Sequence, residues 1–203
     1  MAVNYVVQAE VVDINSDSPK QEDVFLVDTN VWYWMTYPNA TSYVPNQLAD
    51  YPGYLNNALG AKSTLHHSTL TLSELAHVIE RTERQIYEQS VGRINTKEYR
   101  HNLAAERTRV VSEIQAAWGQ VTNLAGGLAI TVDAQTATDA LTRMSIEKVD
   151  GYDLLILETM KKHGVIQIIT DDGDYSNVPG ITVFTANPNV IAAAKAQGKL
   201  TIR

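Results

Sequence analysis

Two short, mainly apolar runs that lead into acidic residues constrain the fold of this chain most strongly. Val24–Val27 is followed at once by Asp28, and the run at 165–169 leads into an acidic loop that contains Asp171, Asp172 and Asp174. A short run that is apolar at every position is typical of a strand covered on both faces, as in a parallel sheet. Functional groups gather beyond the carboxyl ends of such strands, so we expect these acids at one edge of the sheet.

The rest of the chain alternates between strand and helix patterns. Further strands are predicted at residues 3–12, 65–70, 130–132 and 181–184. Helices are predicted after Asn30, from Thr71 to a break at 92–96, from Tyr99 to Val121, at 133–144 and 151–163, and after Pro188. This alternation predicts an α/β fold with a mainly parallel central sheet flanked by helices.

Composition limits the chemistry that the chain can perform. Its 203 residues fit one domain, 44% of them are apolar, and the formal net charge is −7. Affinity for nucleic acid therefore requires a local basic patch or bound cations. The absence of cysteine excludes disulfides, thiolate metal sites and cysteine nucleophiles. Because the N-terminus lacks a signal-peptide pattern and no apolar run reaches about 20 residues, we expect a cytoplasmic protein without a membrane partner.

Two more acidic residues lie where helices are predicted to begin. Glu74 follows Thr71 at the spacing of a capping box, and Asp153 follows Asp150 at another helix start. Helix capping is therefore one interpretation of both acids, and Asp28 has the same alternative. Asp153, however, shares a helical stripe with apolar residues and is expected to point inward, where an unpaired carboxylate is costly. Acids that face one another favour a bound cation instead.

Four segments in series resemble the PIN-domain nucleases, and among these the ribonuclease toxins of bacterial type II toxin–antitoxin pairs. The segments are FLVDTNVW, TLSELAHVI, GYDLLILETMKKHG and IITDDGDYSNVPGITVFTAN. The last, a T-x-D-x-D-Y loop before a short strand, is the most specific. The resemblance implies a PIN-like α/β fold for residues 24–203, with an extension at 1–23 (a strand and a polar linker) and a helical insertion around 81–122.

Carried over residue by residue, the resemblance implies an acidic active site. Its four catalytic acids would be Asp28, Glu74, Asp153 and Asp172. Asp172, rather than Asp171, occupies the fourth acidic position, and Asp153 matches the third position better than Asp150. These four acids, with Asp174, would bind Mg²⁺ or Mn²⁺ through the hard oxygen ligands that such ions prefer. Supporting contacts are expected from Thr29 and Asn30, which we also place at the substrate, and from Thr170 or Asp174.

A basic stretch lies in the helical insertion. Residues 81–109 carry seven basic side chains, Arg81, Arg84, Arg93, Lys97, Arg100, Arg107 and Arg109, against the four acids Glu83, Glu88, Glu98 and Glu106. One interpretation is a phosphate-binding arm, with Arg93, Lys97 and Arg100 as substrate contacts. The other is a solvated helix pair with intrahelical salt bridges, such as Arg84–Glu88.

These features leave competing functions. The first is a metal-dependent endoribonuclease that hydrolyses RNA phosphodiester bonds, as a toxin with an antitoxin protein and a second copy of the chain as partners. The second is a non-catalytic PIN-type module that binds RNA or protein. A DNA-directed nuclease of the related flap and exonuclease group is disfavoured, since its long helical arch is not evident. Retention of all four acids favours the enzyme.

Overall fold

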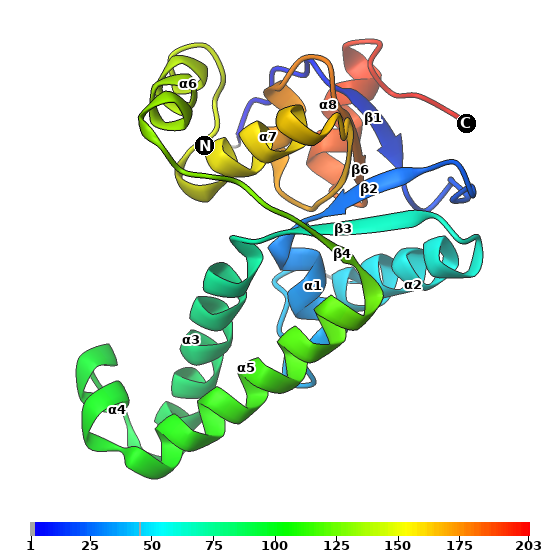
Figure 1. Ribbon diagram of the computed structural model, residues 1–203. Helices are drawn as coiled ribbons and strands as arrows, with labels where there is room; N and C mark the ends of the chain where they lie inside the picture. Colours follow the sequence, from blue (N-terminus) through cyan, green and yellow to red (C-terminus); the bar gives the residue numbers. More distant parts are fainter. Residues whose placement is uncertain (1–2, 45) are drawn as a thin grey trace.

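Six short strands form one parallel sheet through the middle of the molecule (Figure 1). The structure is a computed structural model that describes residues 3–44 and 46–203; residues 1, 2 and 45 lie outside the described residues. The strands are β1 (Glu10–Asp13), β2 (Val24–Val27), β3 (Thr64–Ser68), β4 (Gly126–Leu128), β5 (Gln167–Ile169) and β6 (Thr182–Thr185). Their order is β1-β6-β5-β2-β3-β4, and every neighbouring pair is parallel. The predicted α/β class and parallel sheet are confirmed.

Alternating side chains of the strands bury two separate cores, one on each face of the sheet. Phe25 and Val27 point into the core formed with α1 (Thr29–Thr36), α2 (Gln47–Gly60), α3 (Thr71–Val91) and α5 (Ala104–Leu124). Leu26 points into the opposite core, formed with α6 (Ala134–Met144), α7 (Gly151–His163) and α8 (Pro188–Ala196). Because both faces are covered, the strand is apolar at every position.

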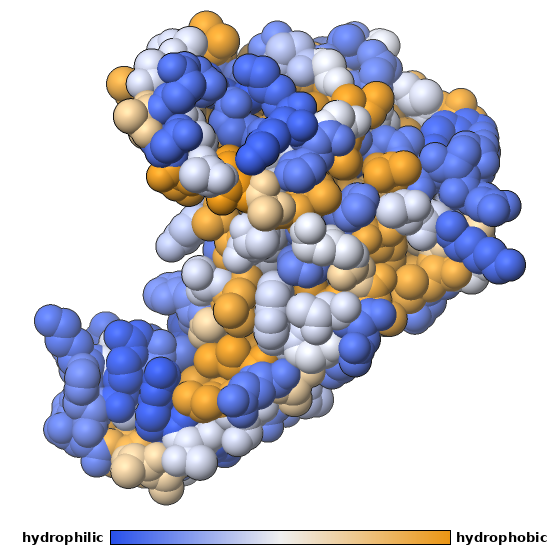
Figure 2. Space-filling model, in the orientation of Figure 1, coloured by the Kyte–Doolittle hydropathy of each residue, from blue (hydrophilic) through white to orange (hydrophobic). Residues whose placement is uncertain are grey.

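Helices α3 and α5 form an arm that extends away from the sheet and carries the short helix α4 (Thr96–Asn102) at its outer end (Figure 1). The predicted break at 92–96 is confirmed, and Gly92 ends α3 with a φ of 89°, which favours glycine. Hydrophilic residues cover the outer end of the arm (Figure 2).

Two predicted elements differ from the structure. The helix expected from Tyr99 to Val121 is divided at Leu103, whose non-helical backbone (φ −113°, ψ 77°) separates α4 from α5. The strand expected at 130–132 is absent, and β4 lies instead at Gly126–Leu128. A β-carbon at Gly126 would lie 3.2 Å from the His66 ring and one at Gly127 3.2 Å from the His67 ring. Glycine at both positions therefore lets this edge strand pair beside two imidazoles.

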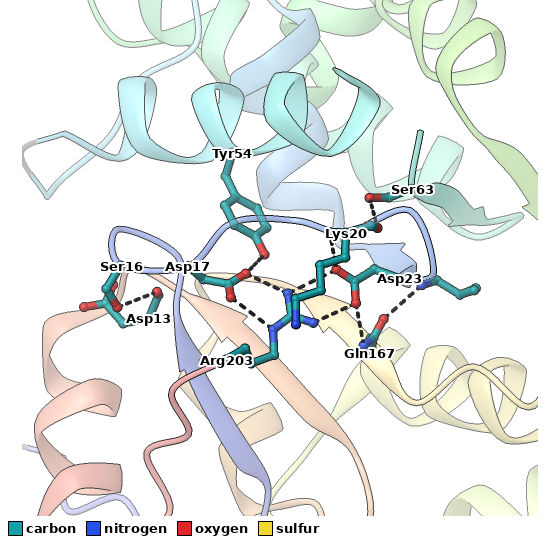
Figure 3. A network of polar contacts seen from close by, with 10 residues as sticks. Asp13, Ser16, Asp17, Lys20, Asp23, Tyr54, Ser63, Gln167 and Arg203 are labelled. Carbon is teal, nitrogen blue, oxygen red and sulfur yellow. Dashed lines mark hydrogen bonds and ion pairs between the residues drawn. The ribbon is translucent and has the colours of Figure 1, made fainter. Parts of the chain in front are cut away.

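The N-terminal segment contributes an edge strand to the same sheet. The strand predicted at 3–12 is shorter than expected, and β1 pairs with β6 in register Glu10↔Thr182. The polar linker that follows is held by Arg203, which lies between the carboxylates of Asp17 and Asp23 (Figure 3). In the described part of the chain, no helix combines the length and apolarity needed to cross a bilayer.

Candidate acidic active site

Asp28 lies where β2 meets α1, and its carboxylate is buried (6% exposed). Oδ1 accepts a hydrogen bond from the Thr29 backbone N–H at 2.6 Å, so Asp28 caps α1. Oδ2 accepts hydrogen bonds from Asn30 Nδ2 at 2.8 Å and from the Thr170 hydroxyl at 2.6 Å. Helix capping and a place in the acidic site are therefore compatible for this residue.

Thr170 joins the first and fourth predicted acids. Its Oγ1 donates to Asp28 and accepts a hydrogen bond from the backbone N–H of Asp172 at 2.9 Å. The side chain of Asp172 caps the short 3-10 helix η1 (Gly173–Asn177), with Oδ1 accepting from the Asp174 N–H at 2.9 Å. The parallel pairing of β2 with β5 thus places the two strand ends, and the acids that follow them, side by side.

Glu74 and Asp153 reach the same place from the first turns of α3 and α7. Glu74 accepts a hydrogen bond from the Thr29 hydroxyl at 2.7 Å, and Asp153 accepts one from the Tyr175 hydroxyl at 2.8 Å. The capping-box interpretation of Glu74 is wrong, because the N-cap of α3 is Leu70 and makes no side-chain cap hydrogen bond. Asp150 is the N-cap residue of α7, but its side chain makes no capping hydrogen bond.

All four acids line one open pocket of about 530 Å³. Burial, followed by the charges of Asp172 and Glu74, raises the pKa of Asp28 to about 7. Burial and the charge of Asp28 likewise raise the pKa of Asp153 to about 7. The pKa of Glu74 is raised by burial and by Asp153. The carboxylates therefore repel one another, and the site stores an unfavourable interaction that a cation would relieve.

Two neighbouring acids differ from the central four. Asp171 lines the pocket, but its carboxylate accepts hydrogen bonds from Tyr51 at 2.7 Å and from Gln47, which hold it against α2. Asp174 is exposed and does not line the pocket. Burial and the charges of Asp172 and Asp150 raise its pKa. Its predicted role as a metal ligand stays a prediction.

The predicted substrate contacts on the arm lie outside this pocket. Arg93 and Lys97 are exposed at the outer end, and Arg100 donates two hydrogen bonds to Glu80, at 2.7 and 2.6 Å. Other arm cations also face carboxylates: Arg84 with Glu88, Arg107 with Glu80, and Arg109 with Glu83 and Glu106. The ion pairs along the arm agree with a solvated helix pair. The exposed Arg93 and Lys97 at its outer end, which make no ion pair with the described residues, remain available for a phosphate-binding role.

Sequence reasoning missed two residues of the site. Tyr175 is fully buried and holds Asp153, a contact that only the folded chain reveals. Arg81 lines the acidic pocket together with Val78 and Glu74. The spacing of these three residues at i, i+4 and i+7 puts them on one face of α3, so this signal was present in the sequence.

The donor set suits a hard divalent cation, since every candidate ligand is a carboxylate oxygen. Glu74 Oε1, Asp153 Oδ2 and Asp172 Oδ2 accept no hydrogen bond from the described residues. Within those residues, however, no three acidic or histidine side chains are grouped closely enough to hold a metal ion as they stand. The chemistry of the oxygens therefore fits a cation, while a complete ligand set is not preformed.

Comparison with known proteins decides the family. A family model described as the PIN domain matches residues 25–181, which is most of the chain. The chain belongs to the PIN-domain family. Among solved structures, this PIN domain is similar to a chain of the VapBC2 complex from Rickettsia felis, crystallised with a DNA fragment from its promoter. That likeness has a TM-score of 0.45 at 13% identity and covers 80% of this chain and 98% of the other. No curated protein matches.

Proposed function

We propose that this PIN domain is a metal-dependent endoribonuclease that hydrolyses RNA phosphodiester bonds with Mg²⁺ or Mn²⁺ as cofactor. The observation that carries the proposal is the convergence of Asp28, Glu74, Asp153 and Asp172 on one pocket. Burial and repulsion raise the pKa values of Asp28, Glu74 and Asp153, so this cluster is costly to keep without a cation. Membership of the family adds support, because the resemblance of the four segments implies that these four acids are its catalytic residues.

The residues of the chain would divide the work in this way. Asp28, fixed by three hydrogen bonds, would hold the cation together with Asp172 and Glu74. When bound, such a cation lowers the pKa of a coordinated water and neutralises charge on the phosphate. Asp153, with a pKa of about 7, would accept a proton at Oδ2 while Tyr175 holds its Oδ1. No nucleophilic side chain is needed.

Asp172→Asn tests the proposal, with Asp171→Asn as its matched control. Asp172→Asn should lower cleavage of an oligoribonucleotide by at least about a hundredfold, since a charged ligand is lost. RNA affinity should be unchanged or slightly higher. Asp171→Asn should keep most of the activity, because Tyr51 and Gln47 hold that carboxylate at the pocket wall. Chelation should abolish cleavage and Mn²⁺ should restore it.

A non-catalytic module that binds RNA or protein is the second candidate. One observation favours it: no preformed group of three metal ligands exists among the described residues. Cleavage by Asp172→Asn at the wild-type rate, in preparations that lack contaminating nuclease, would replace the enzyme with this module.

The motif resemblance extends the proposal to a toxin with an antitoxin protein and a second copy of the chain as partners. Expression of this chain alone should arrest growth, and co-expression of a small protein encoded beside it should restore growth. Light scattering on the purified chain measures the oligomeric state. Normal growth under strong expression of an active nuclease would remove the toxin part of the proposal and leave the enzyme in place.

A further inference from the structure

The acidic pocket has a second wall of different chemistry. Beyond the acids it is lined by Tyr33 and Trp34 of α1, by Tyr43 and Val44 of the loop that follows, and by Val78 and Arg81 of α3. Pockets that bind small organic groups commonly combine apolar or aromatic walls with a few polar groups. We name Trp34, Tyr43, Val78 and Arg81 the aromatic subsite.

Arg81 is the single cation among the residues that line this pocket, so far as the structure describes them. It lies seven residues beyond Glu74 on the same face of α3, which corresponds to roughly 10 Å along the helix. The guanidinium is exposed and makes no ion pair with the described residues, whereas four other cations of the arm each face a carboxylate. An unpaired guanidinium at this distance from the acids can bind a phosphate of the RNA next to the one that is cleaved.

Trp34 gives the subsite a rigid aromatic surface. Its indole Nε1–H donates to the Thr41 carbonyl at 3.2 Å, and its ring packs 5.1 Å from the Tyr51 ring. Tyr51 in turn donates to Asp171 at the acidic end of the pocket, so the aromatic wall and the acids share one support. Tyr43, in contrast, is fully exposed at the rim (101% exposed). Exposed aromatic rings beside a cation are the usual platform for unpaired bases.

We propose that the aromatic subsite binds one unpaired nucleotide of the RNA next to the cleaved bond. Its base lies against Trp34 and Tyr43, and its phosphate is bound by Arg81. The inference rests on the proposed function. It adds that the RNA must be single-stranded beside the cleaved bond, since a base held in a duplex cannot enter the pocket. Arg81, rather than the predicted Arg93, Lys97 and Arg100, then supplies the phosphate contact nearest to the acids.

Binding of single-stranded oligoribonucleotides, measured by fluorescence anisotropy in Ca²⁺ at several salt concentrations, tests the subsite. Arg81→Ala should weaken binding about five- to tenfold and reduce the salt slope by about 0.7, the value for one phosphate contact on a single strand. Lys195→Ala, which removes an exposed cation of α8 outside this pocket, should alter neither. Arg81→Lys should keep the slope. An unchanged slope in Arg81→Ala overturns the phosphate contact.

Oligonucleotides with one abasic residue, moved along the strand, test the base contact. One abasic position should weaken binding to the wild type about tenfold, in line with the loss of a stacked base. Tyr43→Ala should bind the intact and abasic strands equally, and Tyr43→Phe should behave as the wild type. If Tyr43→Ala still distinguishes the two strands as the wild type does, the subsite is wrong.

The two proposals fail separately. If Asp172→Asn loses cleavage while Arg81→Ala and Tyr43→Ala bind every probe normally, the nuclease stands and the subsite falls. If no variant or wild type cleaves RNA but binding depends on Arg81 and Tyr43, the subsite stands and the nuclease falls. Melting temperatures of the two variants should match the wild type, because both side chains are exposed.

Discussion

At the scale of single residues, the buried acids of the pocket lower the free energy of unfolding when they are charged. The folded pKa of Asp153, about 7, exceeds its ordinary value of 3.8 because of burial and then the charge of Asp28. Between these two pH values the folded chain binds more protons than the unfolded chain. The free energy of unfolding of the metal-free protein should therefore fall as the pH rises from about 4 to about 7.

Asp153→Asn makes this cost measurable. The amide oxygen can still accept the hydrogen bond of Tyr175, so the substitution removes mainly a charge. We expect the variant to be more stable than the wild type at pH 8, by on the order of 2–4 kcal/mol, and equally stable near pH 4. Mg²⁺ should stabilise the wild type more than the variant. Thermal unfolding across pH measures both effects.

Asp150→Asn is the control for that experiment, because this neighbouring acid is exposed. It should give a much smaller gain in stability at pH 8 than Asp153→Asn, because it removes a charge from an exposed position. Equal gains from the two substitutions would mean that general surface charge, and not burial among acids, sets the stability of this region.

The sequence showed these acids because each follows an apolar run or begins a helix, and such positions are visible in a pattern of residue types. Their partners were less visible. Thr170 was predicted to support the fourth acid, but its hydrogen bond to Asp28 and that of Tyr175 to Asp153 arise only when β5 and η1 lie beside those acids. Arg81 was counted only as one charge of a basic stretch, because the pocket that it lines depends on how α3 packs against α1.

At the scale of elements, the N-terminal segment packs against the loop that carries two of the acids. The backbone N–H groups of Gln8 and Ala9 donate to Ser176 O of η1 at 2.8 and 3.1 Å. A β-carbon on Gly173 would lie 2.3–2.5 Å from atoms of the Tyr5 ring and its hydroxyl. The segment that precedes β1 therefore supports the acidic loop directly.

Gly173→Ala tests this support. The new methyl group should push Tyr5 away, lower the free energy of unfolding by about 1–3 kcal/mol and weaken Mg²⁺ binding. Adding Tyr5→Ala to the same chain should remove the clash, so the double variant should be no less stable than Tyr5→Ala alone. Gly119→Ala is the control, because nothing lies within 4 Å of its β-carbon. An unchanged melting temperature in Gly173→Ala would show that Tyr5 leaves the loop without cost.

Elements with a clear pattern of apolar residues were predicted well. Elements whose position depends on contacts with neighbouring elements were not. The run that became β2 is apolar throughout, and those that became β5 and β6 are mainly apolar, because helices cover both faces of the sheet. The edge strand β4 contains two glycines, which ordinarily indicate a break, and the room beside His66 and His67 explains them only after folding. No glycine or proline marks the break at Leu103 between α4 and α5, so the sequence pattern did not indicate it.

At the scale of the whole molecule, Arg203 ties the C-terminal segment to the linker between β1 and β2. Its guanidinium bridges the nearly buried carboxylates of Asp17 and Asp23 (Figure 3). It also lies 4.6 Å from the centre of the Phe184 ring. Burial is the largest single influence and acts to raise the pKa of both acids. It is outweighed by the hydrogen bonds and charge of Arg203 together with hydrogen bonds from Tyr54 to Asp17 and from the Lys20 N–H and Gln167 to Asp23, so both pKa values lie below the usual range.

Arg203→Ala should leave two acids without their cation and lower the free energy of unfolding by about 3–5 kcal/mol at neutral pH. Lowered folded pKa values give stability that is present above about pH 4 and is lost as the pH falls further. The difference between variant and wild type should therefore shrink in acid. Lys199→Ala, which removes the exposed pair with Glu10, should cost at most about 1 kcal/mol. Urea unfolding at several pH values compares the two variants. Similar losses of unfolding free energy would contradict a stabilising role for the buried ion pairs of Arg203.

The strand order also determines when, during synthesis of the chain, the acidic pocket can form. Thr170 and Asp28 are 142 residues apart in the chain, yet they share a hydrogen bond, and the Asp28 N–H donates to the Ile169 carbonyl at 3.0 Å. A ribosome adds about 5–20 residues per second, so Thr170 follows Asp28 by roughly 7–28 s. Until then the central strand has no neighbour on one side. A growing chain carries its first acid long before the pocket closes around it, so a chain with the proposed activity would be unable to cut the message that it is being made from until Thr170 has been added.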